Sequence, residues 1–365
     1  MRNFLTGFLN KAIDWLFRVR TLGAQLLKAG VALLLVVLGV DYAGKFALRY
    51  GELNVNIEGS TGNSLPAYIG YVATAIAFVM IVMGCILVWR DERRERRKLL
   101  IVIEVRGLHN GPDSPAKDVV KRAFRGPRTS VLVDFRPQQA GELVNPELML
   151  DRIRGMLLQV GSAKSGRDPS DVFVAAGGLA AVPAMFLVGM RLEDESRVER
   201  YDWNRDLADW KMIDGIDDGN RPIPVSIPST LLAQQEVVLA VSASYAVDEI
   251  AIAVTFPGLS VIRLAAAKMQ TNAFWSESAQ QAFAVEFRDV VQQLGAHQIK
   301  RIHLILAAPA SLTLRLGATY DERLHPELVA YQYEKSSSPP YPWGVLLPNH
   351  GTVEPTIFRV GTTPA

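Results

Sequence analysis

The amino-acid sequence predicts an N-terminal transmembrane α-helical hairpin followed by a soluble α/β domain. Three observations lead to this fold class. Residues 67–89 carry no charged side chain and are numerous enough to cross a bilayer as a helix. The later chain alternates short apolar runs with helical patterns, which is typical of a parallel sheet with crossover helices. The same order of elements then occurs twice, which predicts two similar halves.

The membrane anchor is expected over residues 1–98. The 23 residues of 67–89 form a helix longer than a hydrocarbon core of about 30 Å. An earlier apolar stretch, about residues 22–42, is predicted as the first transmembrane helix, although two polar residues interrupt it. Apolar residues before it recur on one helical stripe, which favours either an interfacial helix over about residues 3–20 or a cytosolic extension of the first span.

The charges flanking these spans predict their orientation. Residues 90–98 are strongly basic and should stay in the cytoplasm, because basic loops are retained on that side. The loop of residues 49–66 carries one basic and two acidic residues, as expected outside. We therefore expect a multi-pass protein with both termini and the soluble domain in the cytoplasm.

Composition excludes one class of partner for the soluble part. Residues 107–365 hold 25 Lys and Arg against 29 Asp and Glu, a net charge of about −4. Binding to long DNA or RNA needs a basic face, so a nucleic-acid polymer is not expected, whereas a small nucleotide held by a few local groups is compatible. The one cysteine, Cys85, lies within the second span, so no intramolecular disulfide forms.

An internal repeat organises the soluble part, with one half expected over 99–225 and the other over 226–365. The first copy runs strand, helix, strand, apolar helix, strand over residues 130–135, 146–160, 171–176, up to 189, and 198–203. The second copy repeats that order over residues 236–241, 276–294, 301–306, up to 317, and 327–333. We expect two parallel sheets packed about a pseudo-twofold axis.

In such sheets, ligands bind beyond the carboxyl ends of the strands, at loops that lead to helix N-termini. The repeat therefore indicates four candidate loops: Asp134 to Arg136, Gly177-Gly178, Ser242 to Tyr245, and Pro309 to Ser311. A glycine turn that opens a helix offers backbone N–H groups to a phosphate, although Gly177-Gly178 is at least as often only a tight turn. Aromatic residues near strand ends, including Trp203 and Trp343, are either core or stacking platforms for a base.

The sequence indicates no catalytic machinery. It has no G-x-G-x-x-G or P-loop motif, and Ser242 and Ser244 lack the G-x-S-x-G context of a hydrolase nucleophile. The five histidines show no metal-ligand spacing. We therefore expect no catalytic residues, no metal and no cofactor.

Several segments, taken in order, resemble the SAVED domain of bacterial cyclic-oligonucleotide antiphage signalling (CBASS), in particular the membrane effectors in which two transmembrane helices precede SAVED. The resemblance covers nearly the whole soluble part. It lies in residues 174–183 (VAAGGLAAVP), 201–203 (YDW) with Trp210, 241–245 (VSASY), 303–311 (HLILAAPAS), 316–318 (LGA), 329–334 (VAYQYE) and 341–343 (YPW).

This resemblance implies two fused CARF-like, Rossmann-type subdomains in a protein of the bacterial inner membrane. It implies a cyclic di- or trinucleotide ligand, made by a partner nucleotidyltransferase, and oligomerisation on binding. Clustered membrane helices would then breach the membrane and cause abortive infection. The alternatives are a membrane-tethered enzyme that degrades the cyclic nucleotide and a membrane scaffold without a ligand. Expected ligand contacts are Arg136, Gly177, Gly178, Trp203, Ser242, Ser244, Tyr245, Trp275, Pro309, Ser311 and Trp343.

Overall fold

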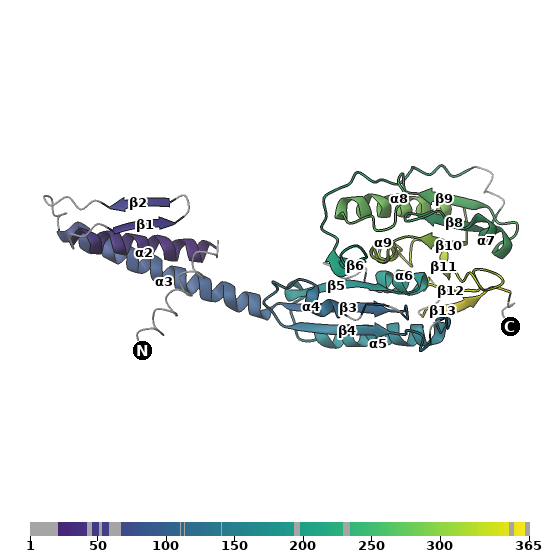
Figure 1. The fold of residues 1–365 in the computed structure, drawn as a ribbon, viewed down its shortest axis with the longest axis horizontal. Coiled ribbons are helices and arrows are strands. Elements are labelled where there is room, and N and C mark those ends of the chain that lie inside the picture. The colour runs from purple at the N-terminus through teal and green to yellow at the C-terminus, as the bar shows by residue number, and fades with distance from the viewer. Residues whose placement is uncertain are drawn as a thin grey trace. The chain divides into compact units, whose positions relative to one another are not determined.

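The structure of the protein is a computed structural model that describes residues 21–41, 46–50, 53–57, 67–109, 111–112, 114–139, 141–192, 198–228, 234–349 and 354–361. The chain divides into two compact units, residues 1–97 and 98–365, each described by itself. Figure 1 shows the elements of both units. The interfacial helix expected over about residues 3–20 lies outside the described residues.

Two helices in contact make up most of the first unit. Helix α2 covers Leu22–Asp41 and helix α3 covers Ala67–Arg97. A Cβ added at Gly23 would lie 2.8 Å from Leu87 Cβ, and one added at Gly84 would lie 2.7 Å from the Leu27 nitrogen. Small residues at these positions let the two backbones approach closely, as they do between transmembrane helices.

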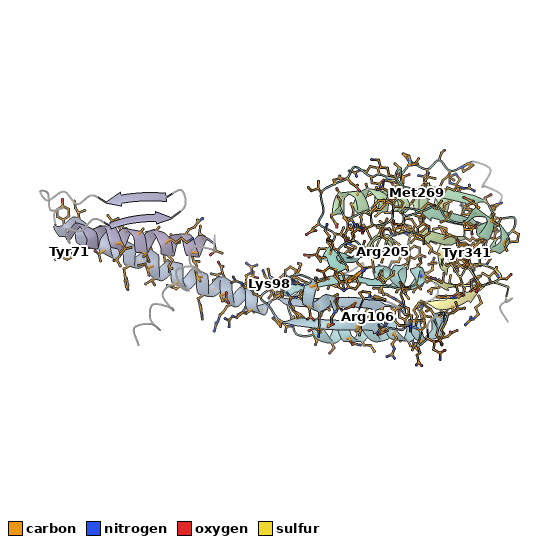
Figure 2. All side chains as sticks on the ribbon, in the orientation of Figure 1. Tyr71, Lys98, Arg106, Arg205, Met269 and Tyr341 are labelled. Atoms are coloured by element: carbon orange, nitrogen blue, oxygen red, sulfur yellow. The ribbon has the colours of Figure 1, made fainter. Side chains whose placement is uncertain are left out.

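Among the described residues, α3 is the one helix that is long and apolar enough to cross a membrane by length and composition. Its most apolar 18-residue stretch has a mean hydropathy of 2.6. Tyr71, labelled in Figure 2, and Trp89 are exposed near the ends of its apolar part, where aromatic side chains meet bilayer interfaces. The helix does not stop at residue 89 but continues to Arg97. Arg and Glu favour helix, and Arg96 pairs with Glu92 one turn earlier at 3.2 Å.

A strand pair lies between α2 and α3, where the sequence analysis predicted only a loop. Strand β1, Phe46–Tyr50, runs antiparallel to β2, Leu53–Ile57. The second segment, LNVNI, alternates apolar and polar residues, which is the period of a strand.

The first half of the second unit is a five-stranded sheet in the order β4-β3-β5-β6-β7, and its first four strands are parallel. Strand β7 pairs antiparallel with β6. The strands are β3 (Leu99–Arg106), β4 (Arg128–Asp134), β5 (Val172–Leu179), β6 (Val198–Asn204) and β7 (Asp209–Met212). The helices are α4 (Ala116–Val119), α5 (Pro146–Lys164) and α6 (Val182–Arg191).

The second half is a six-stranded sheet in the order β13-β12-β11-β10-β8-β9. Strands β9, β8, β10 and β11 are parallel, and β12 and β13 add antiparallel pairs. The strands are β8 (Glu236–Ser242), β9 (Val261–Ala265), β10 (Arg301–Ala307), β11 (Glu327–Gln332), β12 (Trp343–Leu346) and β13 (Thr356–Arg359). The helices are α7 (Glu249–Thr255), α8 (Glu277–Ala296) and α9 (Ala310–Gly317).

The two sheets repeat one topology, but the expected alignment of the repeat was wrong by one strand. Sheet order makes β3 equivalent to β8 and β4 equivalent to β9, whereas residues 130–135 were matched with residues 236–241. The error arose because β3 directly follows the basic segment and β9 is only five residues long, so neither was recognised. The later elements were matched correctly.

Helices α6 and α9 pack against each other between the two sheets (Figure 1). A Cβ added at Gly189 would lie 2.0 Å from the Leu314 carbonyl oxygen, and one added at Gly317 would lie 2.1 Å from the Phe186 carbonyl oxygen. The contact is reciprocal, since each glycine follows by three residues the carbonyl that faces the other glycine. Backbone therefore meets backbone at the centre of the core, where only glycine fits.

Candidate ligand-binding site

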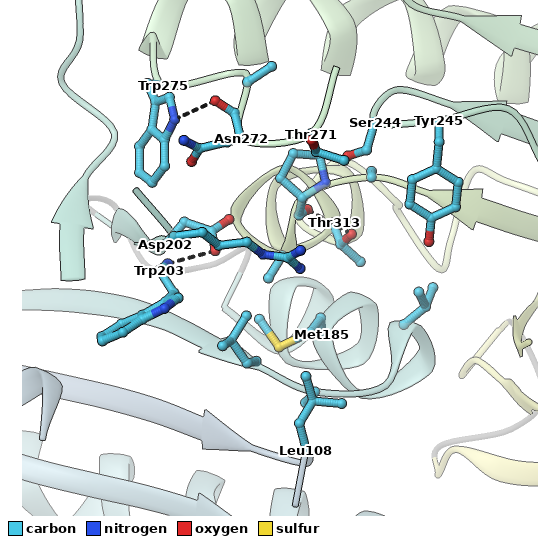
Figure 3. Close-up of a pocket in the computed structure, with 18 residues that line it drawn as sticks. Leu108, Met185, Asp202, Trp203, Ser244, Tyr245, Thr271, Asn272, Trp275 and Thr313 are labelled. Carbon is cyan, nitrogen blue, oxygen red and sulfur yellow. Dashed lines mark hydrogen bonds between the residues drawn. The ribbon is translucent and has the colours of Figure 1, made fainter. Parts of the chain in front are cut away.

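A cavity of about 290 Å³ lies at the carboxyl ends of β5, β8 and β10, next to the starts of α6 and α9 (Figure 3). Both halves of the second unit contribute to it, as expected for parallel sheets. Its lining consists of Leu108, Leu179, Ala180, Val182, Met185, Asp202, Trp203, Arg205, Ser244, Tyr245, Thr271, Asn272, Ala273, Trp275, Ala308, Pro309, Ala310 and Thr313. Five of the expected ligand contacts are in this set: Trp203, Ser244, Tyr245, Trp275 and Pro309.

The structure contradicts the expected turn at Gly177-Gly178. Gly177 and Gly178 lie inside strand β5 and do not open a helix. A Cβ at Gly177 would lie 2.3 Å from the Tyr201 carbonyl oxygen, and one at Gly178 would lie 2.2 Å from the Val105 carbonyl oxygen. The glycines therefore allow neighbouring strands to pack, and the turn that leads into α6 consists of the next two small residues, Ala180 and Ala181.

In each half, a side chain at the end of a strand caps the N-terminus of a helix, α6 or α9, that belongs to the other half. The Asp202 carboxylate, at the end of β6, accepts a hydrogen bond from the Ser311 backbone N–H of α9 at 2.9 Å. The Gln332 side-chain oxygen, at the end of β11, accepts one from the Val182 backbone N–H of α6 at 3.2 Å. Burial raises the pKa of the Asp202 carboxyl above its ordinary value, while the hydrogen bonds from Ser311 and Trp203 oppose that shift.

Two indole rings form one side of the cavity. Trp203 packs edge-to-face on Trp210 with ring centroids 5.3 Å apart, and Trp275 donates its Nε1–H to the Asn272 carbonyl oxygen at 2.8 Å. Figure 3 shows both indoles on one side and Tyr245 on the other. Trp343, the third expected stacking residue, is buried on β12 away from this lining and donates its Nε1–H to Glu334 at 2.7 Å.

The expected serines separate into different environments. Ser244 lines the cavity, whereas the Ser242 hydroxyl accepts a hydrogen bond from the Val247 N–H at 3.2 Å. Ser311 is buried, and its hydroxyl accepts from the Gln280 side chain at 2.9 Å. Of the three hydroxyls, that of Ser244 is the one placed beside the empty space.

The expected arginine is paired at the edge of the first sheet. Arg136 bonds the Asp134 carboxylate through Nη2 at 2.7 Å and does not line the cavity. Arg205, in the turn between β6 and β7 and labelled in Figure 2, lines it instead. Among the described residues of the lining, Arg205 is the one with a cationic side chain, so it can contact an anionic group of a ligand.

Two further cavities, of about 310 and 550 Å³, adjoin the first. The 310 Å³ cavity shares Val182 and Tyr245 with the first, and the 550 Å³ cavity shares Leu108 with the first and both Gln332 and Tyr333 with the 310 Å³ cavity. The first cavity and the 310 Å³ cavity both reach the start of α6 at Val182. The second unit therefore offers a concave, partly aromatic surface that extends beyond the first cavity.

Comparison with family models identifies this architecture. Residues 154–347 match the model of the SMODS-associated and fused to various effectors sensor domain, SAVED. The chain belongs to the SAVED family. Residues 2–150 match the model of the SAVED-fused 2TM effector domain, so this is a SAVED sensor joined to a two-transmembrane effector. The structure places β3 and β4, which lie within the second match, in the SAVED sheet.

Solved structures with a similar fold include SAVED/CARF-domain receptors. The Cap4 receptor of Acinetobacter baumannii with the cyclic trinucleotide 2'3'3'-cAAA is 9% identical, with a TM-score of 0.44, over 77% of this chain and 58% of that chain. The same receptor with 3'3'3'-cAAA is 11% identical, with a TM-score of 0.46, over 77% and 58%. This chain thus spans about 58% of the length of those proteins. No curated protein matches the chain.

Sequence reasoning missed five polar residues of this cavity: Asp202, Arg205, Thr271, Asn272 and Thr313. Asp202 lies within the YDW segment that carried the resemblance, so its position beside Trp203 was an available signal. Arg205 and Asn272 lie in turns after β6 and before α8, and only the packing of the two halves brings these turns together. The Asn272 side-chain N–H donates to the Asp206 carboxylate across that junction.

Proposed function

We propose that this protein is a receptor for a cyclic oligonucleotide and that binding makes its SAVED units assemble, which gathers the membrane helices and breaches the bacterial inner membrane. The ligand would come from a partner nucleotidyltransferase, and the lesion would serve abortive infection in CBASS defence. The protein would be multi-pass, with both termini and the SAVED unit in the cytoplasm. This function is that of a receptor and not of an enzyme.

The cavity at the junction of the two halves carries this proposal. It combines two indoles that can stack on bases, one arginine for a phosphate, and the hydroxyls of Ser244, Thr271 and Thr313 for ribose or phosphate oxygens. The adjoining cavities give room for more than one base. A cyclic di- or trinucleotide has the repeated base, ribose and phosphate groups that such a surface accommodates.

Assembly is proposed as the link between ligand and membrane. The first unit offers helices α2 and α3 and no separate catalytic domain among its described residues, so its action is expected to depend on how many copies gather. A ligand that switches such an equilibrium from 1:99 to 99:1 must favour the assembled state by about 5.5 kcal/mol. Contacts to ligand from more than one copy would supply this preference.

The binding test uses the full chain in detergent with a panel of cyclic di- and trinucleotides, starting with the two cyclic tri-adenylates named above. We expect one ligand to bind and to raise the mass measured by sedimentation. Arg205→Gln should weaken its binding about tenfold or more, because a charged hydrogen bond is lost. Arg136→Gln is the matched control, since Arg136 pairs with Asp134 outside the cavity.

A second pair of variants tests the hydroxyls. Ser244→Ala should weaken binding several-fold, and Ser242→Ala should leave affinity unchanged because its hydroxyl bonds Val247. Equal effects of the two variants would contradict the placement of the ligand. No binding by any member of the panel to folded protein would contradict the receptor function.

The membrane step is tested in vesicles that enclose a fluorescent dye. Protein reconstituted into these vesicles should release dye only when the bound ligand is added, and Arg205→Gln should need more ligand. Chromatography of the ligand after incubation separates receptor from degrading enzyme, because an enzyme would produce linear nucleotides. Binding without dye release would contradict the membrane lesion while leaving the receptor function intact.

A further inference from the structure

One side chain in the cavity is left with an unpaired buried acceptor. The Asn272 side-chain N–H donates to the Asp206 carboxylate, and its carbonyl oxygen Oδ1 is buried without a hydrogen-bond partner among the residues that the structure describes. A carboxylate only accepts, so this contact fixes the amide with its NH₂ toward Asp206 and its oxygen away from it. A buried acceptor without a partner is destabilising, and such groups are rare in folded proteins.

The backbone around Asn272 is also held in an uncommon conformation. Asn272 has a φ of 58° and Phe274 a φ of 63°, both in the left-handed region. Asparagine tolerates this region, whereas a bulky phenylalanine rarely adopts it, and such strain gathers at ligand sites. Contacts to both halves hold the loop in place, since Gly215 donates its N–H to the Trp275 carbonyl at 2.8 Å and Gln280 donates to the Phe274 carbonyl at 2.8 Å.

The two indoles place this amide where the edge of a base would lie. Trp203 and Trp275 both line the cavity with Asn272, and Trp275 is tied to the same loop by its bond to the Asn272 carbonyl. Figure 3 shows the Asn272 amide beside the Trp275 ring. A base that stacks on an indole directs its edge sideways, toward groups that surround the ring. Asn272 is half-buried and the neighbouring Thr271 is exposed, so the amide lies just beneath the surface of the protein.

We propose that Asn272 reads one base of the ligand, with Oδ1 accepting a hydrogen bond from an exocyclic amino group. The site would therefore select a base that carries such a group, as adenine, guanine and cytosine do, over one that lacks it. This proposal rests on the proposed receptor function and adds a specificity residue to it. The orphaned acceptor supplies the discrimination, because a base without the amino group leaves Oδ1 unpaired in the complex as well.

The test compares matched ligands that differ only in that amino group. Cyclic di- and trinucleotides containing adenine are titrated into the full chain beside the same rings containing purine, and guanine rings beside hypoxanthine rings. We expect the ring without the amino group to bind about tenfold to a hundredfold more weakly in at least one pair. Asn272→Gly keeps the left-handed backbone but removes the amide, so it should bind both members of that pair with similar affinity.

The control is Gln298→Gly. Gln298 has a φ of 66° and is exposed in the turn before β10, at the amino ends of the strands, so the same change there should preserve the discrimination. Two results would overturn the role of Asn272 and leave the receptor function intact. One is equal affinity of the wild type for both members of every pair, and the other is discrimination that survives in Asn272→Gly. Failure of every ring to bind would overturn the receptor function together with it.

Discussion

The two halves of the SAVED unit share one topology but cap their central helices with different chemistry. Asp202 places a carboxylate on the N-terminus of α9, and Gln332 places a neutral amide on the N-terminus of α6. A helix N-terminus carries roughly half a positive charge, which a carboxylate neutralises and an amide does not. Duplicated geometry therefore does not give duplicated electrostatics: the carboxylate of Asp202 interacts with the charge of Arg205, whereas Gln332 brings no charge to the start of α6.

The largest effect on the free energy of unfolding is expected at the α6–α9 contact, where the two halves are most alike. Gly189→Ala and Gly317→Ala each push a methyl group against a backbone carbonyl, so each should destabilise the fold by about 3 kcal/mol or more. Thermal unfolding of the full chain in detergent should show a fall of about 6–12 °C in Tm.

Gly155→Ala is the control for this pair. Gly155 lies within α5, and a Cβ there meets no described residue within 4 Å, so alanine should stabilise the helix by about 0.5–1 kcal/mol. A similar fall in Tm for all three variants would show that glycine is needed for some reason other than the backbone contact.

An intermediate effect is expected at the caps, where the halves differ. Asp202→Ala leaves the buried Ser311 N–H without a partner and should cost about 1–3 kcal/mol. Gln332→Ala should cost less, about 0.5–1 kcal/mol, because Gln332 is half-buried and Val182 can bond water. Asp202→Asn retains an acceptor and should behave nearly as the wild type. If Gln332→Ala cost as much as Asp202→Ala, the proposed difference between the caps would be wrong.

The smallest expected effect is a pH dependence of the stability, and it arises from a histidine of the second half. His303 is buried on β10 between the Tyr331 hydroxyl at 2.8 Å and the Glu236 carboxylate at 3.0 Å. Burial lowers the pKa of His303, although Glu236 opposes the shift. The unfolded chain therefore takes up a proton below pH about 6.5 that the folded chain does not, and stability falls as pH falls, by at most about 1.4 kcal/mol per pH unit.

His303→Gln should flatten this dependence in unfolding curves recorded between pH 5 and 8. Burial also lowers the pKa of His325, which remains in the variant and contributes the residual slope. A variant whose slope equals that of the wild type would rule out His303 as the source.

Patterns along the chain predicted much of this fold, since apolar runs, helical periodicity and their repetition are local signals. Strand β9 escaped because it is short and interrupted by Arg263, and Gly177-Gly178 was misassigned because glycine in a strand and glycine in a turn look alike until the neighbouring strands are known. Of the site, Trp203 was accessible because it lies near the end of a strand, and Ser244 and Tyr245 because they follow one. Asn272 was not, because its neighbour Asp206 is distant in sequence and only the packing of the halves joins them.

The glycine contact between α6 and α9 also limits how the SAVED unit can move. Two helices that meet backbone to backbone cannot slide along each other by a fraction of a turn without forcing main-chain atoms together. A sliding motion between the two halves would therefore have to break this contact together with the caps that Asp202 and Gln332 make across the same junction.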